Sequence, residues 1–178
     1  MNAAKADRAE VSVRVELAEI GSAAVATGLT VLDYLLGELA GQARMKLSVE
    51  VAPGAVDAEV AAAGRGLGEG LFTLLRAPGT TGSGFAWLPA DEALAGAVLE
   101  IAERPLLASN VDFSGQGVGG VGSDVVKGFL GQLAEGAGIN VHIRVLEGKD
   151  PQNVLRAIFK ALGAALGQAC RTPERGNP

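Results

Sequence analysis

The stretch LGELAGQARMKLSV (residues 36–49) recurs later in the chain as LGQLAEGAGINVHI (residues 130–143). In both copies an apolar spacing typical of a helix gives way to the two-residue alternation typical of a strand. A second pair follows, since LGEGL (67–71) recurs as LGAAL (162–166), at an offset only one residue longer. Two matches at nearly the same offset indicate an internal duplication, which predicts a fold of two similar halves.

Outward from these stretches, each half is predicted to contain a helix, a strand and a second helix. The predicted helices are residues 30–43, 57–75, 123–137 and 151–169, and the strands between them are 44–51 and 140–147. Further strand candidates precede the first unit (9–17) and the second (84–89, 95–102 and 105–113).

These elements predict an α+β fold of duplicated half-domains, each a small, mostly antiparallel sheet with two helices. An amphipathic helix on a sheet must be covered, so we expect the helices of both halves to pack together between the two sheets. The first half-repeat is assigned to residues 9–82 and the second to 83–170. Residues 1–8 form an N-terminal tail, and residues 171–178 a disordered C-terminal tail.

Composition excludes several classes of function. The 178 residues are 48% hydrophobic but only 4% aromatic, so the core must consist mainly of Ala, Val and Leu. A net charge of −5 without any Lys/Arg run argues against nucleic acid or an anionic membrane as partner. A single cysteine excludes an intrachain disulfide, the charged start is unlike a signal peptide, and no apolar run reaches about 18 residues. We therefore expect a cytoplasmic protein.

The isolated motifs of the chain give little indication of a catalytic or nucleotide-binding site. GQGVGG (115–120) satisfies a dinucleotide-binding pattern but lacks the acidic residue expected afterwards, so a flexible connection with Ser123 capping the next helix is favoured. His142, the only histidine, is more often structural than catalytic at such a position, and Cys170 has no nearby base. The glycines at alternate positions from Gly64 to Gly70 indicate either very tight helix packing or an irregular segment.

The segment GKDPQNVLRAIFKALGAAL (148–166) has the frame of an anion site. Asp150 is a good N-cap, Pro151 suits the first helical turn, and Lys149 lies beside the free N–H groups of a helix start. The first turn, however, offers only side chains that are poor acids, bases and metal ligands: Gln152, Asn153 and Arg156.

Four segments in this order resemble the imidazoleglycerol-phosphate dehydratase family: TGLTVLDYLL, LPADEALAGAVLEIAERPLL, VGGVGSDVVKGFLGQLAEGAGINVHI and GKDPQNVLRAIFKALGAAL. The resemblance covers nearly the whole chain. It implies a duplicated α+β fold assembled into large symmetric oligomers. It also implies two manganese ions at subunit interfaces and the removal of water from imidazoleglycerol phosphate in histidine biosynthesis.

The sequence departs from this family where the resemblance places the metal ligands. Those positions hold Tyr34, Gln42, Asp57, Ala58, Ala61, Gln152, Asn153 and Arg156, and the family's basic pair falls on Thr81 and Gly82. One histidine per chain cannot supply many imidazole ligands, and the guanidinium of Arg156 repels a cation. We therefore expect no metal cofactor. The chain is also shorter than the family between Ile20 and Thr27, which suggests a lost hairpin.

Some of the residues that the resemblance places around the substrate are retained. Lys149 and Arg104 match phosphate-binding positions of the family, and Asp91 and Glu92 match positions near the reacting part of the substrate. Each of these residues also has a purely structural interpretation. The acidic pair would start a turn or helix, Arg104 would form a surface salt bridge, and Lys149 would lie in a solvated loop.

The leading hypothesis is a non-catalytic relative of the dehydratase. It would form homo-oligomers, bind a phosphorylated small-molecule anion, and act as a binding, regulatory or assembly subunit. The alternatives are the dehydratase itself, or a metal-independent lyase or isomerase that uses Asp91, Glu92 and Lys149.

Overall fold

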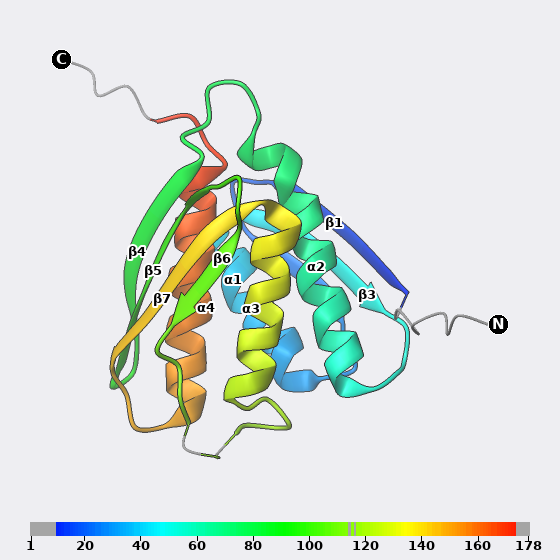
Figure 1. Cartoon of the computed structure of the whole chain (residues 1–178), viewed down its shortest axis with the longest axis vertical. Coiled ribbons are helices and arrows are strands. Elements are labelled where there is room, and N and C mark those ends of the chain that lie inside the picture. The colour runs from blue at the N-terminus through cyan, green and yellow to red at the C-terminus, as the bar shows by residue number, and fades with distance from the viewer. Residues whose placement is uncertain (1–9, 114, 116, 174–178) are drawn as a thin grey trace.

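The computed structural model describes residues 10–113, 115 and 117–173 of the chain. Four helices lie between two β-sheets and all begin at the lower end of the molecule in Figure 1. The helices are α1 (Thr30–Ala43), α2 (Val56–Leu75), α3 (Ser123–Ala137) and α4 (Pro151–Ala169).

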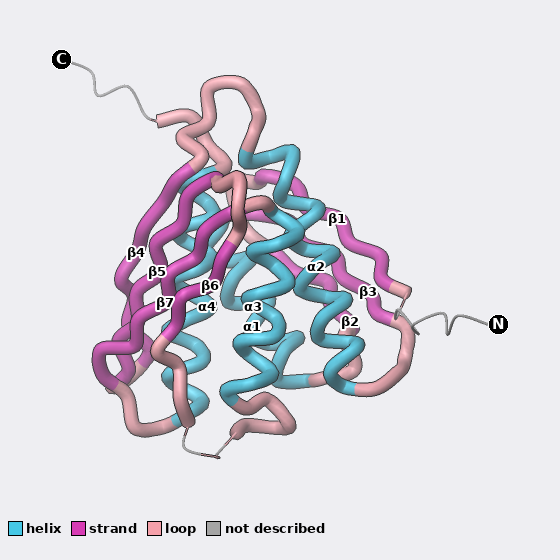
Figure 2. The backbone as a smooth tube through the Cα atoms, viewed as in Figure 1, coloured by secondary structure: helices cyan, strands magenta, loops and turns pink. Residues whose placement is uncertain are grey.

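The larger sheet has the strand order β4-β5-β7-β6, and the smaller sheet has the order β1-β3-β2 (Figure 2). The strands are β1 (Val11–Leu17), β2 (Ser22–Ala26), β3 (Met45–Val51), β4 (Ser83–Ala90), β5 (Ala93–Ile101), β6 (Leu106–Ser109) and β7 (Ile139–Glu147). In the larger sheet only the β6–β7 pair is parallel. In the smaller sheet β1 is antiparallel to β3, and β2 is parallel to it.

The internal duplication is visible in this topology. β1, β3 and β2 correspond in order and direction to β5, β7 and β6, so both halves repeat one arrangement. β4 has no counterpart among the described residues of the first half. The predicted α+β fold, with helices between two sheets, is confirmed.

Glycines let the helices of the two halves approach closely. A Cβ on Gly68 of α2 would come within 3 Å of the Leu133 carbonyl oxygen of α3. At the equivalent place in the other pair, a Cβ on Gly163 of α4 would come equally close to the Leu39 carbonyl oxygen of α1. The glycine-rich part of α2 is therefore a regular helix, and close packing rather than irregularity accounts for its glycines.

Three local predictions differ from the structure. The strand expected over residues 105–113 covers only Leu106–Ser109, where β6 pairs with β7. β2 was not predicted, because its five residues SAAVA are mostly alanine, which has little preference for strands. Ser123 does not cap α3, since the N-cap is Gly122 and the Ser123 hydroxyl instead accepts the N–H of Phe113 at 2.7 Å.

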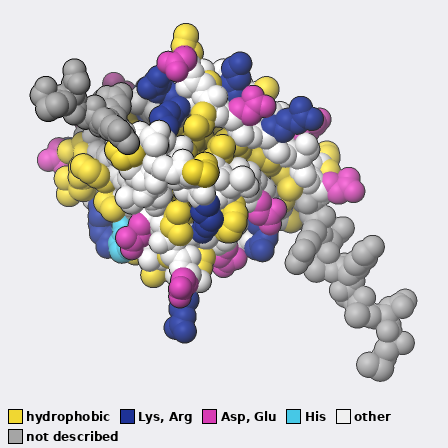
Figure 3. Space-filling view, turned by 90° about the horizontal axis from the view of Figure 1, so that it is seen from above, with side chains coloured by type: hydrophobic (Ala, Val, Ile, Leu, Met, Phe, Trp, Pro, Cys, Tyr) yellow, Lys and Arg dark blue, Asp and Glu magenta, His cyan; other side chains and the backbone are white. Residues whose placement is uncertain are grey.

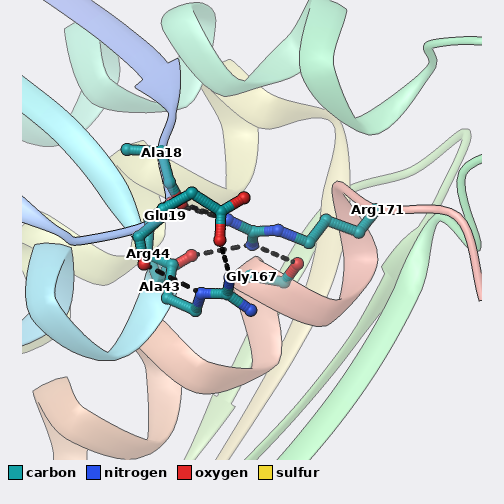
Figure 4. A network of polar contacts seen from close by, with 6 residues as sticks. All are labelled: Ala18, Glu19, Ala43, Arg44, Gly167 and Arg171. Carbon is teal, nitrogen blue, oxygen red and sulfur yellow. Dashed lines mark hydrogen bonds and ion pairs between the residues drawn. The ribbon is translucent and has the colours of Figure 1, made fainter. Parts of the chain in front are cut away.

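Arg171 joins the two halves at the end of α4 (Figure 4). Its guanidinium donates to the carbonyl oxygens of Ala43 and Gly167 (2.8 Å each), Arg44 (2.6 Å) and Ala18 (3.3 Å). The helix C-terminus exposes carbonyl groups that such a cation satisfies. Arg171, the first residue of the predicted C-terminal tail, is thus held in place, while residues 1–9 and 174–178 lie outside the described part.

Candidate functional site

The start of α4 has the predicted frame. Asp150 is the N-cap, and its side chain accepts the Gln152 N–H at 2.9 Å, while Pro151 occupies the first helical position. This cap forms because an aspartate oxygen replaces the missing acceptor for a free N–H at the helix start.

Glu92 fills the anion position in front of this helix. The turn between β4 and β5 carries Asp91 in a left-handed conformation (φ 50°) and directs Glu92 toward α4. One Glu92 oxygen accepts the N–H groups of Asp150 (2.9 Å) and Lys149 (3.2 Å). The other oxygen accepts the side-chain amide of Asn153 at 2.7 Å. A carboxylate of the chain itself therefore occupies the place where an external anion would be expected.

These hydrogen bonds change the acidity of Glu92. Donation from the Asp150 N–H, and next from the Asn153 amide, lowers the pKa of Glu92 from 4.5 to about 2. A catalytic base works best with a pKa near the operating pH. Glu92 is therefore a weak proton acceptor at neutral pH and is suited to hold the turn against the helix.

Asp91 is also engaged by α4. Its carboxylate lies 3.3 Å from the Arg156 guanidinium, in an ion pair whose side chains are 70% and 28% exposed, respectively. One turn further along, the Lys160 ammonium donates to the carbonyl oxygen of Pro89 at 2.6 Å. An ion pair this exposed contributes about 1 kcal/mol at most to stability. Together these contacts fix the β4–β5 turn along one side of α4.

Lys149 borders a small open pocket of about 360 Å³. The pocket is lined by Asn110, Asp112, Phe113, Val145, Gly148, Lys149, Pro151 and Val154. Its lining thus includes one cation and one carboxylate, and the backbone N–H of Lys149 already donates to Glu92. This arrangement allows, at most, weak attraction of a small anion.

Arg104 lies far from this pocket within one chain. It is exposed in the connection between β5 and β6, near Ile101, which pairs with Ile139 at the start of β7. Lys149 follows the other end of β7, roughly 26 Å away at the usual rise of a strand. The structure therefore brings Lys149 together with Asp91 and Glu92 but leaves Arg104 at the opposite end of the sheet.

The remaining sequence candidates are not brought together into a catalytic group. His142 is exposed on the outer face of the larger sheet, between Val98 and Ala108 of the neighbouring strands. Cys170 is buried, and burial raises the pKa of its thiol to about 12. In GQGVGG (115–120), Gln116 lies outside the described residues, and a bridge joins Val118 to Val121 in a tight turn before α3.

The residues at the positions that the resemblance assigns to metal ligands do not fit a manganese ion. Asn153 and Arg156 are occupied with Glu92 and Asp91, and Ala58 and Ala61 at the start of α2 have no side-chain donor. Across the described ranges, no three His, Cys, Asp or Glu side chains lie close enough to hold a metal ion.

Sequence reasoning missed the roles of Asn153 and Arg156. Their residue types identify both only as poor metal ligands, yet both bind the acidic pair of the β4–β5 turn. Their three-residue spacing places them on one face of a helix. This spacing is the feature of the sequence from which a shared binding role could have been predicted.

The chain matches the family model for imidazoleglycerol-phosphate dehydratase over residues 27–166. It is 32% identical to the imidazoleglycerol-phosphate dehydratase of Clostridium botulinum (strain Okra), over 97% of this chain and 90% of that protein. It is 39% identical to the enzyme of the same name from Anaeromyxobacter sp. (strain K), over 90% of this chain and 80% of that protein.

Solved structures agree with the sequence matches. The crystal structure of imidazoleglycerol-phosphate dehydratase from Staphylococcus aureus superposes with a TM-score of 0.81 and 26% identity, over 89% of this chain and 92% of the other. The structure of the Pyrococcus furiosus protein in complex with (S)-C348 gives the same TM-score and identity, over 95% and 93% of the two chains.

Proposed function

Since the chain belongs to the imidazoleglycerol-phosphate dehydratase family, we propose that it is a divergent member without manganese-dependent dehydratase activity. It keeps the fold of the family and acts as a binding, regulatory or assembly subunit. It works as a cytoplasmic homo-oligomer.

One observation carries this proposal. Asn153 and Arg156 stand where the resemblance places metal ligands, and both are bound to the acidic pair that it places near the substrate. The residues that replace the metal ligands are therefore the same residues that bind the carboxylates of Asp91 and Glu92. An amide that holds Glu92 and a guanidinium that holds Asp91 support a structural use of this region.

The chemistry of dehydration leads to the same conclusion. Removing water from an imidazole substrate needs a base of suitable pKa and a cation that stabilises the developing negative charge. Glu92, with a pKa of about 2, is a poor base. Asp91 is paired with Arg156, and the donor set described above does not fit manganese.

Two enzymatic functions compete with this proposal. The names of the relatives at 32% and 39% identity favour the dehydratase itself. A metal-independent lyase or isomerase would need Asp91 and Glu92 as free acids or bases, and no contact of either residue favours that role.

The ligand proposed for Lys149 is a phosphorylated small-molecule anion, bound weakly in the pocket beside α4. The Glu92 carboxylate opposes such binding, because it competes for the same N–H groups. Arg104 can contribute only from another subunit. No nucleic acid or membrane partner is proposed, because acidic and basic side chains are interspersed on the face shown in Figure 3 and the net charge is −5. In the described part of the chain, no helix is both long and apolar enough to cross a bilayer.

Titration with inorganic phosphate and with an imidazole phosphate ester tests this proposal. Binding should be weak in the wild type, abolished in Lys149→Ala and several-fold tighter in Glu92→Gln, which removes the competing charge. Lys127→Ala, which changes an exposed lysine of α3, is the matched control and should bind as the wild type does. Equal binding by wild type and Lys149→Ala would exclude the proposed pocket.

A further inference from the structure

The pocket beside Lys149 lies where two parallel strands end. β6 ends at Ser109 and β7 ends at Glu147, and the two strands form the parallel pair of the larger sheet. Because the carboxyl ends of parallel strands meet at the same edge of a sheet, the segments that follow β6 and β7 come together there. These segments bring Asp112 and Lys149 into the lining of one pocket. Both segments lie at the lower end of the molecule in Figure 1.

The segment that carries Asp112 is anchored on both sides. The Asn110 side chain donates to the Val145 carbonyl oxygen at 3.0 Å and accepts the Val145 N–H at 2.8 Å, so a side chain continues the pairing of β6 with β7. Val111 and Phe113, the two neighbours of Asp112, are buried. The backbone at Asp112 is therefore positioned before a ligand binds, which lowers the cost of ordering the site.

Three polar side chains line the pocket, and two of them can bind a ligand. The Asn110 amide is already used by Val145 through both of its polar groups. Among the described residues, no carboxylate forms an ion pair with the Lys149 ammonium, and Asp112 is no exception. Asp112 has an interaction of its own in the folded chain, but a carboxylate accepts several donors. A cation and a carboxylate that share a pocket without pairing leave space for a ligand between them.

The charges around the pocket determine which ligand suits it. A phosphate monoester carries a charge of about −1.5 to −2 at pH 7. Here it would meet one cation, Lys149, and two carboxylates, Asp112 in the lining and Glu92 on the Lys149 N–H. The two carboxylates oppose a ligand that is only an anion. An ammonium group on the same ligand changes the effect of Asp112 from repulsion to attraction.

The remaining side chains of the lining are apolar, and the pocket is small. Phe113, Val145, Pro151 and Val154 supply a surface for a short carbon chain that joins two charged groups. The volume of about 360 Å³ lies near the lower limit of the range for ligand pockets, so it suits a small molecule.

We infer that the ligand of this pocket is a phosphorylated amine, in which a phosphate monoester and an ammonium group are joined by a short carbon chain. The Lys149 ammonium binds the phosphate, and the Asp112 carboxylate binds the ammonium. This inference rests on the phosphate site proposed above for Lys149. It makes Asp112 the residue that selects one class of phosphorylated compound over others.

Calorimetric titration of the full chain with aminoethyl phosphate and hydroxyethyl phosphate tests the inference. The two esters are nearly equal in size and differ in having an ammonium or a hydroxyl group. The wild type should bind the amino ester roughly fivefold more tightly, which is the contribution of one partly exposed ion pair. In Asp112→Asn the ratio of the two affinities should fall to about one. Hydroxyethyl phosphate should bind this variant more tightly than the wild type, because a repulsive charge is removed.

Two further variants serve as controls. Lys149→Ala should lose the binding of both esters, because it removes the cation that attracts the phosphate. Glu103→Gln removes an exposed carboxylate in the connection between β5 and β6, at the opposite end of the sheet, and should keep the preference of the wild type.

The outcomes separate this inference from the proposed phosphate site. Equal binding of the two esters by the wild type would overturn the inference, although loss of both in Lys149→Ala would still support the phosphate site. A preference for the amino ester that persists in Asp112→Asn would also overturn it. Binding of neither ester by the wild type would overturn both proposals. Retained binding of hydroxyethyl phosphate by Asp112→Asn, with an unchanged circular dichroism spectrum, shows that this variant is folded.

Discussion

Gly64→Ala tests the close helix packing that the duplicated fold requires. Gly64 lies on the side of α2 that faces α3, where an added Cβ would lie 2.5 Å from the carbonyl oxygen of Phe129. Ordinary van der Waals contact begins at 3.4 Å, so the two helices would have to separate by roughly 0.9 Å. The obstructing atom belongs to the backbone and cannot rotate away.

The size of the effect follows from two opposing contributions. Overpacking a close contact costs about 1–3 kcal/mol, and a backbone clash lies toward the upper end of that range. Replacing Gly with Ala inside a helix favours the folded state by about 1 kcal/mol. The expected net loss is therefore about 1–2 kcal/mol in the free energy of unfolding.

Gly131→Ala on the partner helix α3 is the matched control. A Cβ there meets no atom within 4 Å, so only the helix preference remains, and stability should rise by up to about 1 kcal/mol. The free energies of unfolding of the two variants, from thermal and urea unfolding, should therefore differ by about 1–3 kcal/mol, or roughly 2–12 °C in Tm. A Gly64→Ala protein as stable as the Gly131→Ala protein would refute this account of the glycines.

Further predictions concern the site, the thiol, the C-terminal cap and the metal. The lowered pKa of Glu92 adds stability that is complete above about pH 4.5 and is lost as the pH falls toward 2. In Asn153→Ala, carboxyl titration by NMR should show this pKa shifted upward, and an unchanged value would contradict the assigned cause. Cys170, with a pKa of about 12, should react with a thiol reagent at pH 8 only as the protein unfolds, so rapid labelling of the folded protein would contradict its burial. Arg171→Ala removes four hydrogen bonds from a charged donor and should cost about 2–4 kcal/mol in chemical unfolding, with Arg171→Lys intermediate. Elemental analysis should find no stoichiometric manganese or zinc, and about one tightly bound ion or more per chain would count against the donor-set argument.

Much of the fold could be predicted because its main elements have strong periodic patterns. The bounds of α1, α3 and α4 agree with the prediction, since apolar spacing and the Asp150–Pro151 start define them. β2 could not be found, because a short alanine-rich strand gains its stability from pairing with β3 rather than from its own residues.

The site was less predictable than the fold. The sequence indicated that Lys149 and the start of α4 form an anion frame, and it left Asp91 and Glu92 as either the start of a turn or helix or a pair near the substrate. That Glu92 itself fills the frame depends on the antiparallel pairing of β5 with β7, which places the β4–β5 turn beside the start of α4. The separation of Arg104 from Lys149 has the same origin. Such relations depend on strand order, which local sequence patterns do not contain.

The absence of dehydratase activity is the central claim, and a direct assay tests it. Purified protein would be incubated with imidazoleglycerol phosphate and excess manganese, with an authentic dehydratase such as the Staphylococcus aureus relative as a positive control. The expected result is no product above the protein-free background, in the wild type and in the Glu92→Gln variant alike. Manganese-dependent formation of the dehydration product by the wild type would contradict the claim.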